Sequence, residues 1–178
     1  MSIPRPPNPA KLVIGVFLND KNLIELLENE LIAEFGPVDI ISQWFLFDYT
    51  SYYAHEMGSP LFRRMFVFKK LIKQASLSQI KNFTNELEAR YSKNGKRTVN
   101  IDPGYMLHEK FVLATGKNFS HRIYIGNNIY ADLTLIYQNG EFRTLPWTYP
   151  DYADEKMLTF LINVRDKYVA DMKRGQDK

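Results

Sequence analysis

The segment FDYTSYYAHEMG, at positions 47–58, gathers three tyrosines, an aspartate, a histidine and a glutamate in one connection. Phenol rings can stack on a ligand, and a carboxylate can act as a general base. A connection this long is typically functional or disordered, and its aromatic content argues against disorder. We expect it to fold over one end of a sheet and line a pocket, with Tyr49, Tyr52 and Tyr53 as ligand-binding residues and Glu56 as a candidate base. The alternative is a packed flap that covers a strand end.

A second candidate base lies in the stretch NIDPGY, at positions 100–105. Pro103 and Gly104 suit the two central positions of a type II turn, with Asp102 at its first position. Turn formation explains these residue types without any function. The functional interpretation is that Asp102 projects a carboxylate from the point where a strand ends, and acts there as a general base.

Basic residues gather in KFVLATGKNFSHRIY, at positions 110–124. With nearby backbone amides, these side chains could surround a phosphate or a carboxylate. The alternative is a solvated basic loop. The segment does not form a P-loop, because Asn118 follows Lys117 and the first glycine would fall at Phe111. The candidate anion-binding residues are Lys110, Lys117, His121 and Arg122.

Strand alternation after this segment separates two faces. One face carries Arg122, Tyr124, Tyr130, Asp132 and Thr134, and it is either a binding face or a plain outer face. The other face is expected to meet the core, with Ile123, Ile125, Ala131, Leu133 and Leu135. The later segment LPWTYPDY, at positions 145–152, would pack its aromatic rings against the sheet or close the same pocket from the opposite side.

The elements that position these residues follow from hydrophobic periodicity. Strands are expected at 11–18, 38–47, 61–72 and 97–101, and helices at about 20–36 and 76–91. The order strand-helix-strand-strand-helix-strand is that of a ferredoxin-like βαββαβ core. A C-terminal antiparallel β-meander at 121–145 and a terminal helix through Met157 and Met172 would extend it. The sequence therefore predicts a flexible, proline-rich lead-in at 1–10 and a single α+β domain at 11–174.

Local signals mark the ends of these elements. Asn19 or Asp20 can cap the first helix and Gly36 can stop it, while Ser76 and Gln79 form a capping box for the second. Turns are expected at 94–95, 127–128 and 139–140, where asparagine precedes asparagine or glycine.

Composition excludes several classes of function. Among its 178 residues the chain has no cysteine, which excludes thiol catalysis, disulfides and cysteine zinc sites. Its three histidines show no metal-binding spacing, so no metal site is expected. The longest apolar run, LVIGVFL, is far too short to span a membrane, and no signal peptide is visible, so a soluble cytoplasmic protein is expected. A net charge of +3 is low for a nucleic-acid-binding protein, and no RNA-recognition signature is present.

Several segments together resemble a prokaryotic family of domains of unknown function, numbered four-four-one-six. They are FDYTSYYAHEMG, FTNELEARY, VNIDPGYM, VLATGKNFSHRIYIGNNIYADLTL and LPWTYPDY, in order from about residue 11 to 170. The family has Asp where this chain has Ser51, and Ser-Thr-Lys-Asp near positions 114–118, where this chain reads ATGKN. The resemblance implies a small cytoplasmic protein and assigns no catalytic residue. Some members are labelled GTP-binding, and no motif in this sequence supports that label.

The preferred hypothesis is a pocket lined by tyrosine, aspartate and arginine that binds a small anionic ligand bearing a phosphate or carboxylate. Its rival is a non-enzymatic protein-interaction module that uses an exposed aromatic and arginine surface, since such residues concentrate at binding hot spots. RNA binding ranks third. The sequence leaves the cofactor unknown, and it decides neither catalysis nor the oligomeric state.

Overall fold

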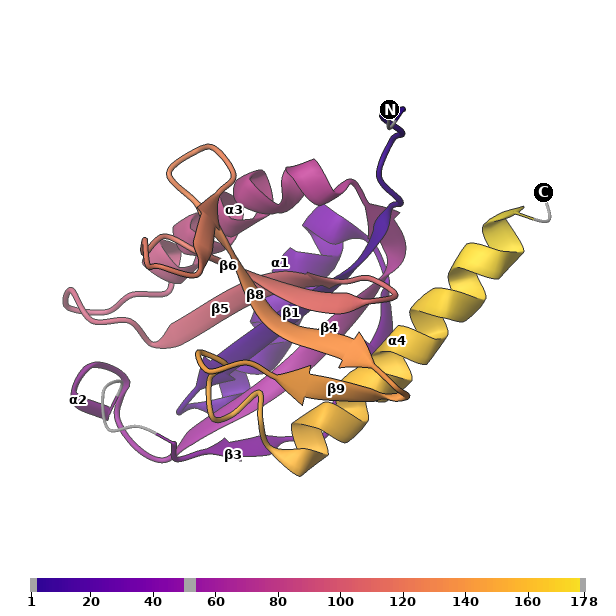
Figure 1. Cartoon of the computed structure of the whole chain (residues 1–178). Coiled ribbons are helices and arrows are strands. Elements are labelled where there is room, and N and C mark those ends of the chain that lie inside the picture. Colours follow the sequence, from indigo (N-terminus) through magenta and orange to yellow (C-terminus); the bar gives the residue numbers. More distant parts are fainter. Residues whose placement is uncertain (1–2, 50–53, 177–178) are drawn as a thin grey trace.

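The computed structural model describes residues 3–49 and 54–176 and has an α+β fold (Figure 1). In the described residues, three long helices and the single-turn helix α2 (Ala54–Met57) accompany a nine-stranded sheet. The long helices are α1 (Ile24–Phe35), α3 (Leu77–Arg90) and α4 (Glu155–Gln176). The strands are β1 (Ala10–Leu18), β2 (Val38–Ile41), β3 (Phe45–Phe47), β4 (Leu61–Ile72), β5 (Val99–Met106), β6 (Lys110–Thr115), β7 (Arg122–Tyr124), β8 (Tyr130–Gln138) and β9 (Glu141–Thr144).

The strands follow one another across the sheet in the order β2-β4-β1-β5-β6-β8-β7. Strand β3 also pairs with β4, and β9 pairs with β8. Every one of these pairings is antiparallel. The buried run at 11–18 therefore lies at the centre of the sheet as expected, between β4 and β5.

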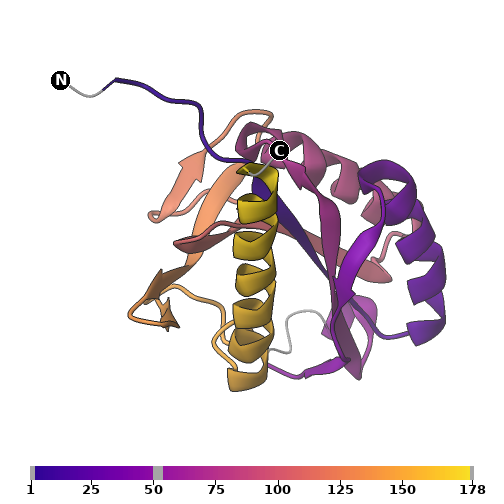
Figure 2. The ribbon, with the colours of Figure 1, turned by 90° about the vertical axis from the view of Figure 1, so that its right-hand side faces the viewer.

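The two faces of β1 enter two different cores. Ile14 and Val16 pack with Leu27 of α1 and Leu87 of α3, whereas Val13 packs with the α4 side. Figure 2 shows α4 on one side of the sheet and α1 on the other. Because successive side chains of a strand point to opposite faces, one apolar strand supports helices on both sides. The second core also contains Met65, Val67, Phe111, Leu113, Met157, Leu161 and Val164.

The stretch predicted as one strand at 38–47 is two strands, β2 and β3, that share β4 as their partner. Ile41 pairs with Phe66, and Phe45 pairs with Arg63. The segment from Ile41 to Phe45 is therefore one residue longer than the segment of β4 that it faces. Ser42 stabilises the break, because its amide donates to the Met65 carbonyl and its hydroxyl accepts from the Met65 amide.

The predicted turn at 100–105 is wrong, because these residues continue strand β5. Asp102, Pro103 and Gly104 pair in register with β1. Gly104 is needed for a close approach, since a Cβ atom there would lie 2.5 Å from the Val112 carbonyl oxygen. Pro103 stands just beyond the last residue of β5 that pairs with β6, where the missing amide is tolerated.

The predicted capping box of the second helix is also wrong. Ser76 has helical backbone angles and its side chain makes no capping hydrogen bond, because the 3-10 turn η2 (Gln74–Ser76) runs directly into α3. The other end signals are confirmed. The Asp20 carboxylate accepts from the Asn22 amide, at the start of the 3-10 turn η1 (Lys21–Leu23) that leads into α1, and Gly36 ends α1 with positive φ.

The predicted β-meander and its turns are confirmed. The prediction of which of its side chains face the core is wrong. Asp132 and Thr134 are buried, whereas Ile123 is 71% exposed. Phe111 pairs with Leu135 and Val112 with Leu133, so β8 carries an extra residue that reverses its alternation. Asp132 is thereby turned to the same side of the sheet as Leu135. Ile123 remains exposed because β7 is the last strand of the path and joins no core cluster.

The lead-in is held at its inner end, where the Asn8 and Pro9 carbonyls accept hydrogen bonds from Gln74 and Tyr168. Within the described chain, no helix is both long enough and apolar enough to cross a membrane.

Candidate functional site

A cavity of about 780 Å³ opens where β5 and β6 stop pairing. Their register runs from Met106 and Phe111 to Gly104 and Leu113, and beyond it both strands line the cavity. This volume is in the range of small-molecule sites. The lining residues are Phe47, Tyr49, Arg63, Lys81, Asn85, Glu88, Arg97, Asn100, Asp102, Leu113, Ala114, Thr115, Gly116, Lys117, Asp132, Tyr149, Pro150, Asp151 and Tyr152.

Helix α3 forms one wall of the cavity through Lys81, Asn85 and Glu88. Their spacing of four and three residues places them on the same face of the helix. Lys81 Nζ donates to the Ile101 carbonyl oxygen at 2.8 Å, and Glu88 Oε1 accepts from the Ile101 amide at 2.7 Å. These two side chains satisfy the backbone carbonyl and amide of Ile101 at a position of β5 that does not pair with β6. Lys81 Nζ and Glu88 Oε1 lie 3.7 Å apart. Burial raises the pKa of the Glu88 carboxyl, although the nearby Lys81 charge and the Ile101 amide partly oppose the shift.

Arg63, on β4, lies buried at the floor of the cavity. Its guanidinium forms an ion pair with Asp151, and its Nη2 lies 3.6 Å from Asp102 Oδ2. The same guanidinium lies over the rings of Phe47 and Tyr152, with its central carbon 4.9 and 4.8 Å from their centroids. Stacking on aromatic faces lets an arginine remain charged in a largely dehydrated place.

Asp102 stands between two cations without a close contact to either. Its Oδ1 lies 3.7 Å from Lys81 Nζ, and its Oδ2 is the atom that faces Arg63. No hydrogen bond to this carboxylate is found within the described residues, and its side chain is 27% exposed. Its acceptor positions are therefore open to the cavity.

Arg97 and Asn100 form the next part of the wall. Arg97 Nη1 donates to Asn100 Oδ1 at 2.8 Å, and this contact fixes the orientation of the amide. The buried Nδ2 of Asn100 then has no acceptor among the described residues. Arg97 also holds Glu56 through Nη2–Oε2 and Nε–Oε1 distances of 2.7 and 2.9 Å. These hydrogen bonds lower the pKa of Glu56 despite a smaller opposing effect of burial.

The opposite wall is built around the buried carboxylate of Asp132. Its Oδ2 accepts from Arg122 Nε at 2.9 Å and lies 3.1 Å from His121 Nε2. Arg122 uses its two remaining nitrogens on the Lys117 carbonyl, at 3.0 Å, and the Tyr149 hydroxyl, at 2.5 Å. Each of the three guanidinium nitrogens of Arg122 thus contacts a protein group of this wall.

The segment at 149–152 closes the cavity. Tyr152 is buried over Gly15, where a Cβ atom would meet the phenol oxygen at 3.3 Å. Burial raises the pKa of Tyr152 to about 12, so the phenol stays neutral. Burial also raises the pKa of Tyr149, against the smaller opposing effect of the Arg122 charge.

The structure brings together part of the predicted set. Tyr49, Asp102, Lys117 and Asp132 line the cavity, and the other predicted residues beside it act on its walls: His121 and Arg122 contact Asp132, and Glu56 contacts Arg97.

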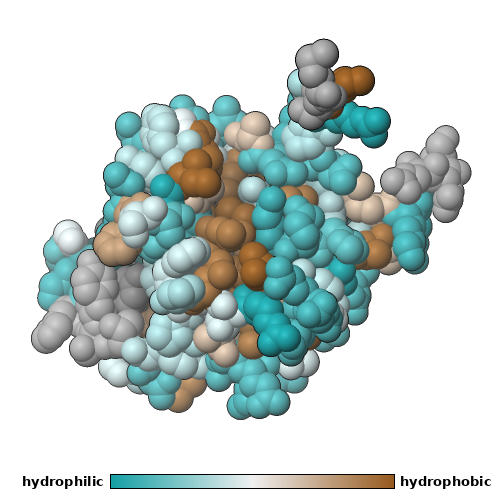
Figure 3. Space-filling model, in the orientation of Figure 1, coloured by the Kyte–Doolittle hydropathy of each residue, from teal (hydrophilic) through white to brown (hydrophobic). Residues whose placement is uncertain are grey.

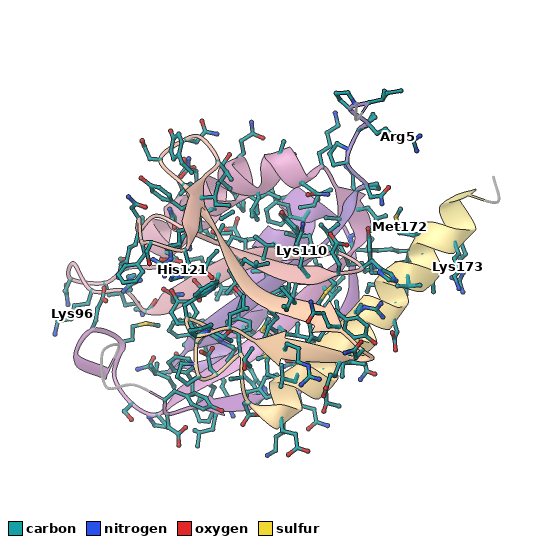
Figure 4. All side chains as sticks on the ribbon, in the orientation of Figure 1. Arg5, Lys96, Lys110, His121, Met172 and Lys173 are labelled. Carbon is teal, nitrogen blue, oxygen red and sulfur yellow. The ribbon has the colours of Figure 1, made fainter. Side chains whose placement is uncertain are left out.

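Other predicted residues lie elsewhere. Lys110 begins β6 at the end opposite Lys117 and pairs with Glu109, and Figure 4 shows it well apart from His121. Tyr124 and Tyr130 contact each other, with ring centroids 5.4 Å apart, and do not line the cavity. Tyr52 and Tyr53 lie outside the described residues.

Sequence reasoning missed Arg63, Lys81, Glu88, Arg97 and Asn100. Two signals were present. Arg63 lies on the same face of β4 as Met65 and Val67, which pack in the core beside α4. Strand alternation therefore places this arginine on a buried face. Lys81 and Glu88 are charged residues seven positions apart beside the apolar stripe of α3. The contacts of Arg97 with Glu56 join positions that are far apart in the sequence, so no local sequence pattern predicts them.

Within the described residues, no group of three or more His, Asp or Glu side chains is placed to hold a metal ion. Comparison with curated proteins and with solved structures finds no match. Comparison with protein families matches residues 8–168 to a domain of unknown function, DUF4416. Because this match covers nearly the whole chain, the protein belongs to the DUF4416 family.

Proposed function

We propose that this protein binds a small ligand bearing a phosphate or carboxylate in the cavity between β5, β6 and α3. The size of the cavity suits such a ligand. Its described lining includes four cationic and four acidic side chains, so the ligand would meet charges of both signs. They are Arg63, Lys81, Arg97 and Lys117, and Glu88, Asp102, Asp132 and Asp151.

The unpaired amide of Asn100 is the observation that carries this proposal. A buried donor without an acceptor costs about 1–3 kcal/mol, so native proteins rarely keep one without a reason. The amide contacts Arg97, whose side chain is 29% exposed at the wall. Asn100 and Arg97 both line the cavity, so a ligand oxygen bound beside Arg97 would be the acceptor that the Asn100 amide lacks.

The proposed anion contacts differ from those expected from the sequence. Arg122 is replaced by Arg97 because Arg97 lines the cavity with a side chain that is 29% exposed, whereas Arg122 does not line it and is 10% exposed. Lys81 and Arg63 supply further positive charge behind the site. Tyr49 and Tyr149 border the cavity, where their rings could contact a flat part of the ligand.

Should the bound ligand react, Asp102 is the proposed general base. It is the lining carboxylate with open acceptor positions, and it faces the cavity between Arg63 and Lys81. Glu56 is less suited to this role, because both of its oxygens accept hydrogen bonds from Arg97.

We also propose that β1, β2, β4 and β5 with helices α1 and α3 form a ferredoxin-like unit. The strand order β2-β4-β1-β5 and the antiparallel pairings support this assignment. The chain would act in the cytoplasm, since the absence of cysteine is compatible with a reducing compartment.

A thermal-shift screen with inorganic phosphate, sugar phosphates and carboxylates tests the binding proposal. A ligand present at 100 times its Kd should stabilise the folded protein by about 2.7 kcal/mol. Arg97→Met and Asn100→Leu should abolish the shift. Arg90→Met is the matched control, because Arg90 lies on α3 outside the cavity and pairs with Glu30. A shift of equal size in all variants, or none in the native protein, would contradict the proposal.

A second candidate function, protein interaction, is favoured by apolar surface. Figure 3 shows an apolar strip over β6 and β8 that is bordered by hydrophilic residues. Phe119, Ile123 and Tyr124 are also strongly exposed near the edge strand β7. Exposed apolar groups of this kind can mark interaction sites. Sedimentation of the native protein beside Ile123→Lys tests self-association: a mass that falls with the substitution would support it.

A further inference from the structure

We propose that the ligand of this cavity carries a hydroxyl or amine donor next to its oxyanion, and that Asp102 recognises this donor. The class is that of hydroxy acids, amino acids and hydroxylated phosphates, rather than simple anions. This inference rests on the proposed function, because it concerns the same site.

The first argument is the open carboxylate of Asp102. Arg63 and Lys81 hold it from behind at 3.6 and 3.7 Å, which is too long for direct hydrogen bonds. The two cations therefore hold the carboxylate in place without using its lone pairs. A carboxylate accepts up to about four hydrogen bonds, so a ligand donor can bind to it directly.

The other acids of the described wall are already engaged. Asp151 is bonded to Arg63, Glu88 accepts from the Ile101 amide, and Asp132 accepts from Arg122. Each has a structural partner that accounts for its burial. Asp102 alone among these four carboxylates has no hydrogen bond from the described residues, so it is the acceptor left for a ligand.

The second argument concerns charge. A ligand oxyanion placed against Asp102 would meet like charge at short range, which is unfavourable in a partly dehydrated site. The oxyanion is therefore expected to lie toward Arg97 and the unpaired amide of Asn100. The part of the ligand that faces Asp102 must then supply a proton for a hydrogen bond.

A site built around such a hydrogen bond discriminates strongly against analogues that lack the donor, because its acceptor would then be left unpaired. Titration calorimetry with matched pairs measures this discrimination. Propyl phosphate in its dianionic form, which has no donor, is compared with glycerol 3-phosphate, and propionate is compared with lactate and alanine. We expect the donor-bearing member of a pair to bind at least about tenfold more tightly to the native protein.

Asp102→Asn and Asp102→Ala should remove this preference, so that the donor-bearing and donor-free members of each pair bind with similar affinity. Asp166→Ala is the control, because Asp166 lies on α4 and its side chain is strongly exposed. Simple anions that bind as tightly as their donor-bearing partners, or a preference that survives both Asp102 variants, would overturn the inference and leave the proposed function intact. If no member of any pair binds, the proposed function fails and this inference fails with it.

Discussion

Arg122 and Asp132 stand directly opposite each other on strands β7 and β8, and Arg122 Nε donates to Asp132 Oδ2 at 2.9 Å. This pair joins the edge strand to the wall of the cavity. Because Asp132 is buried, its carboxylate needs the hydrogen bonds of the partners that surround it. The contact therefore belongs to the folded framework rather than to the ligand.

Replacing Arg122 with alanine should lower the free energy of unfolding by about 3 kcal/mol, because a buried carboxylate loses its closest cation. Urea denaturation measures the change. Arg143→Ala is the control, since Arg143 forms an exposed pair with Glu141 and such pairs contribute only about 0–1 kcal/mol. Equal losses in the two variants would refute the structural role of Arg122.

Glu88→Gln should change how stability depends on pH. The pKa of Glu88 is raised in the folded state above the ordinary value of 4.5. The stability that this group contributes is therefore complete below 4.5 and is lost as pH rises through the raised folded value. As pH increases from 4.5 through the raised pKa of Glu88, the unfolding free energy of the native protein should therefore fall relative to that of Glu88→Gln.

Chemical denaturation of the native protein and Glu88→Gln in a series of buffers between about pH 4 and pH 8 measures this difference. Glu86, exposed on the same helix, provides the control position through Glu86→Gln. A difference between native protein and Glu88→Gln that stays constant with pH would show that burial does not govern this carboxyl.

Gly104→Ala should destabilise the fold by about 1–3 kcal/mol, the usual cost of overpacking. Its Cβ atom would lie 2.5 Å from the Val112 carbonyl oxygen and 2.9 Å from a Leu113 methyl carbon, and backbone can move away only with its strand. Gly116→Ala is the matched control, because nothing lies within 4 Å of its Cβ position. That variant should stay within about 0.5 kcal/mol of the native protein in thermal unfolding. A larger loss from Gly116→Ala than from Gly104→Ala would contradict the close packing of β5 and β6.

Lys11→Met should cost about 3 kcal/mol. Lys11 is fully buried, and its Nζ lies 2.6 Å from both Asp39 Oδ2 and Asp171 Oδ2. Lys167 contacts the same two carboxylates and would compensate in part. Guanidinium denaturation beside Lys70→Met, a change at an exposed position of β4, separates burial from a general loss of positive charge. A loss no larger than that of Lys70→Met would refute the role of the buried ion pairs.

The same network should make the protein sensitive to acid. Burial tends to raise the pKa of Asp39, but hydrogen bonds and charge from Lys11 and Lys167 outweigh it and lower the value below 3.8. This contribution to stability is present above pH 3.8 and is lost as pH falls through the lower folded value. Asp39→Asn should therefore flatten the acid branch of the stability curve, as followed by circular dichroism. An unchanged acid branch would assign the acid sensitivity to other carboxylates.

The order of elements was predictable because each depends on local pattern. The apolar run of β1 and the spacing of Leu27 and Leu31 determine buried faces without reference to distant residues. Positive φ at Gly36 follows equally from a local signal. These features explain why the α+β class and the long helices agree with the sequence.

The site was predictable only in part, because its geometry depends on pairings between strands. The extra residue in β8 turns Asp132 inward, and strict alternation cannot show this. Asp102 was selected for its place near a strand end, yet it lies within β5 and reaches the cavity because β6 stops pairing at Leu113. Arg97 and Glu56 are brought together by tertiary folding alone.

The position of α4 has a consequence for synthesis. This helix covers the face of the sheet that carries Val13, Met65 and Val67, and it is the last helix of the chain. A nascent chain therefore emerges from the ribosome with one side of its central strands still bare, although the α1 and α3 side can already close. Exposed apolar strands of this kind attract chaperones and other nascent chains. Emergence of α4 is thus the step that covers this face of the sheet.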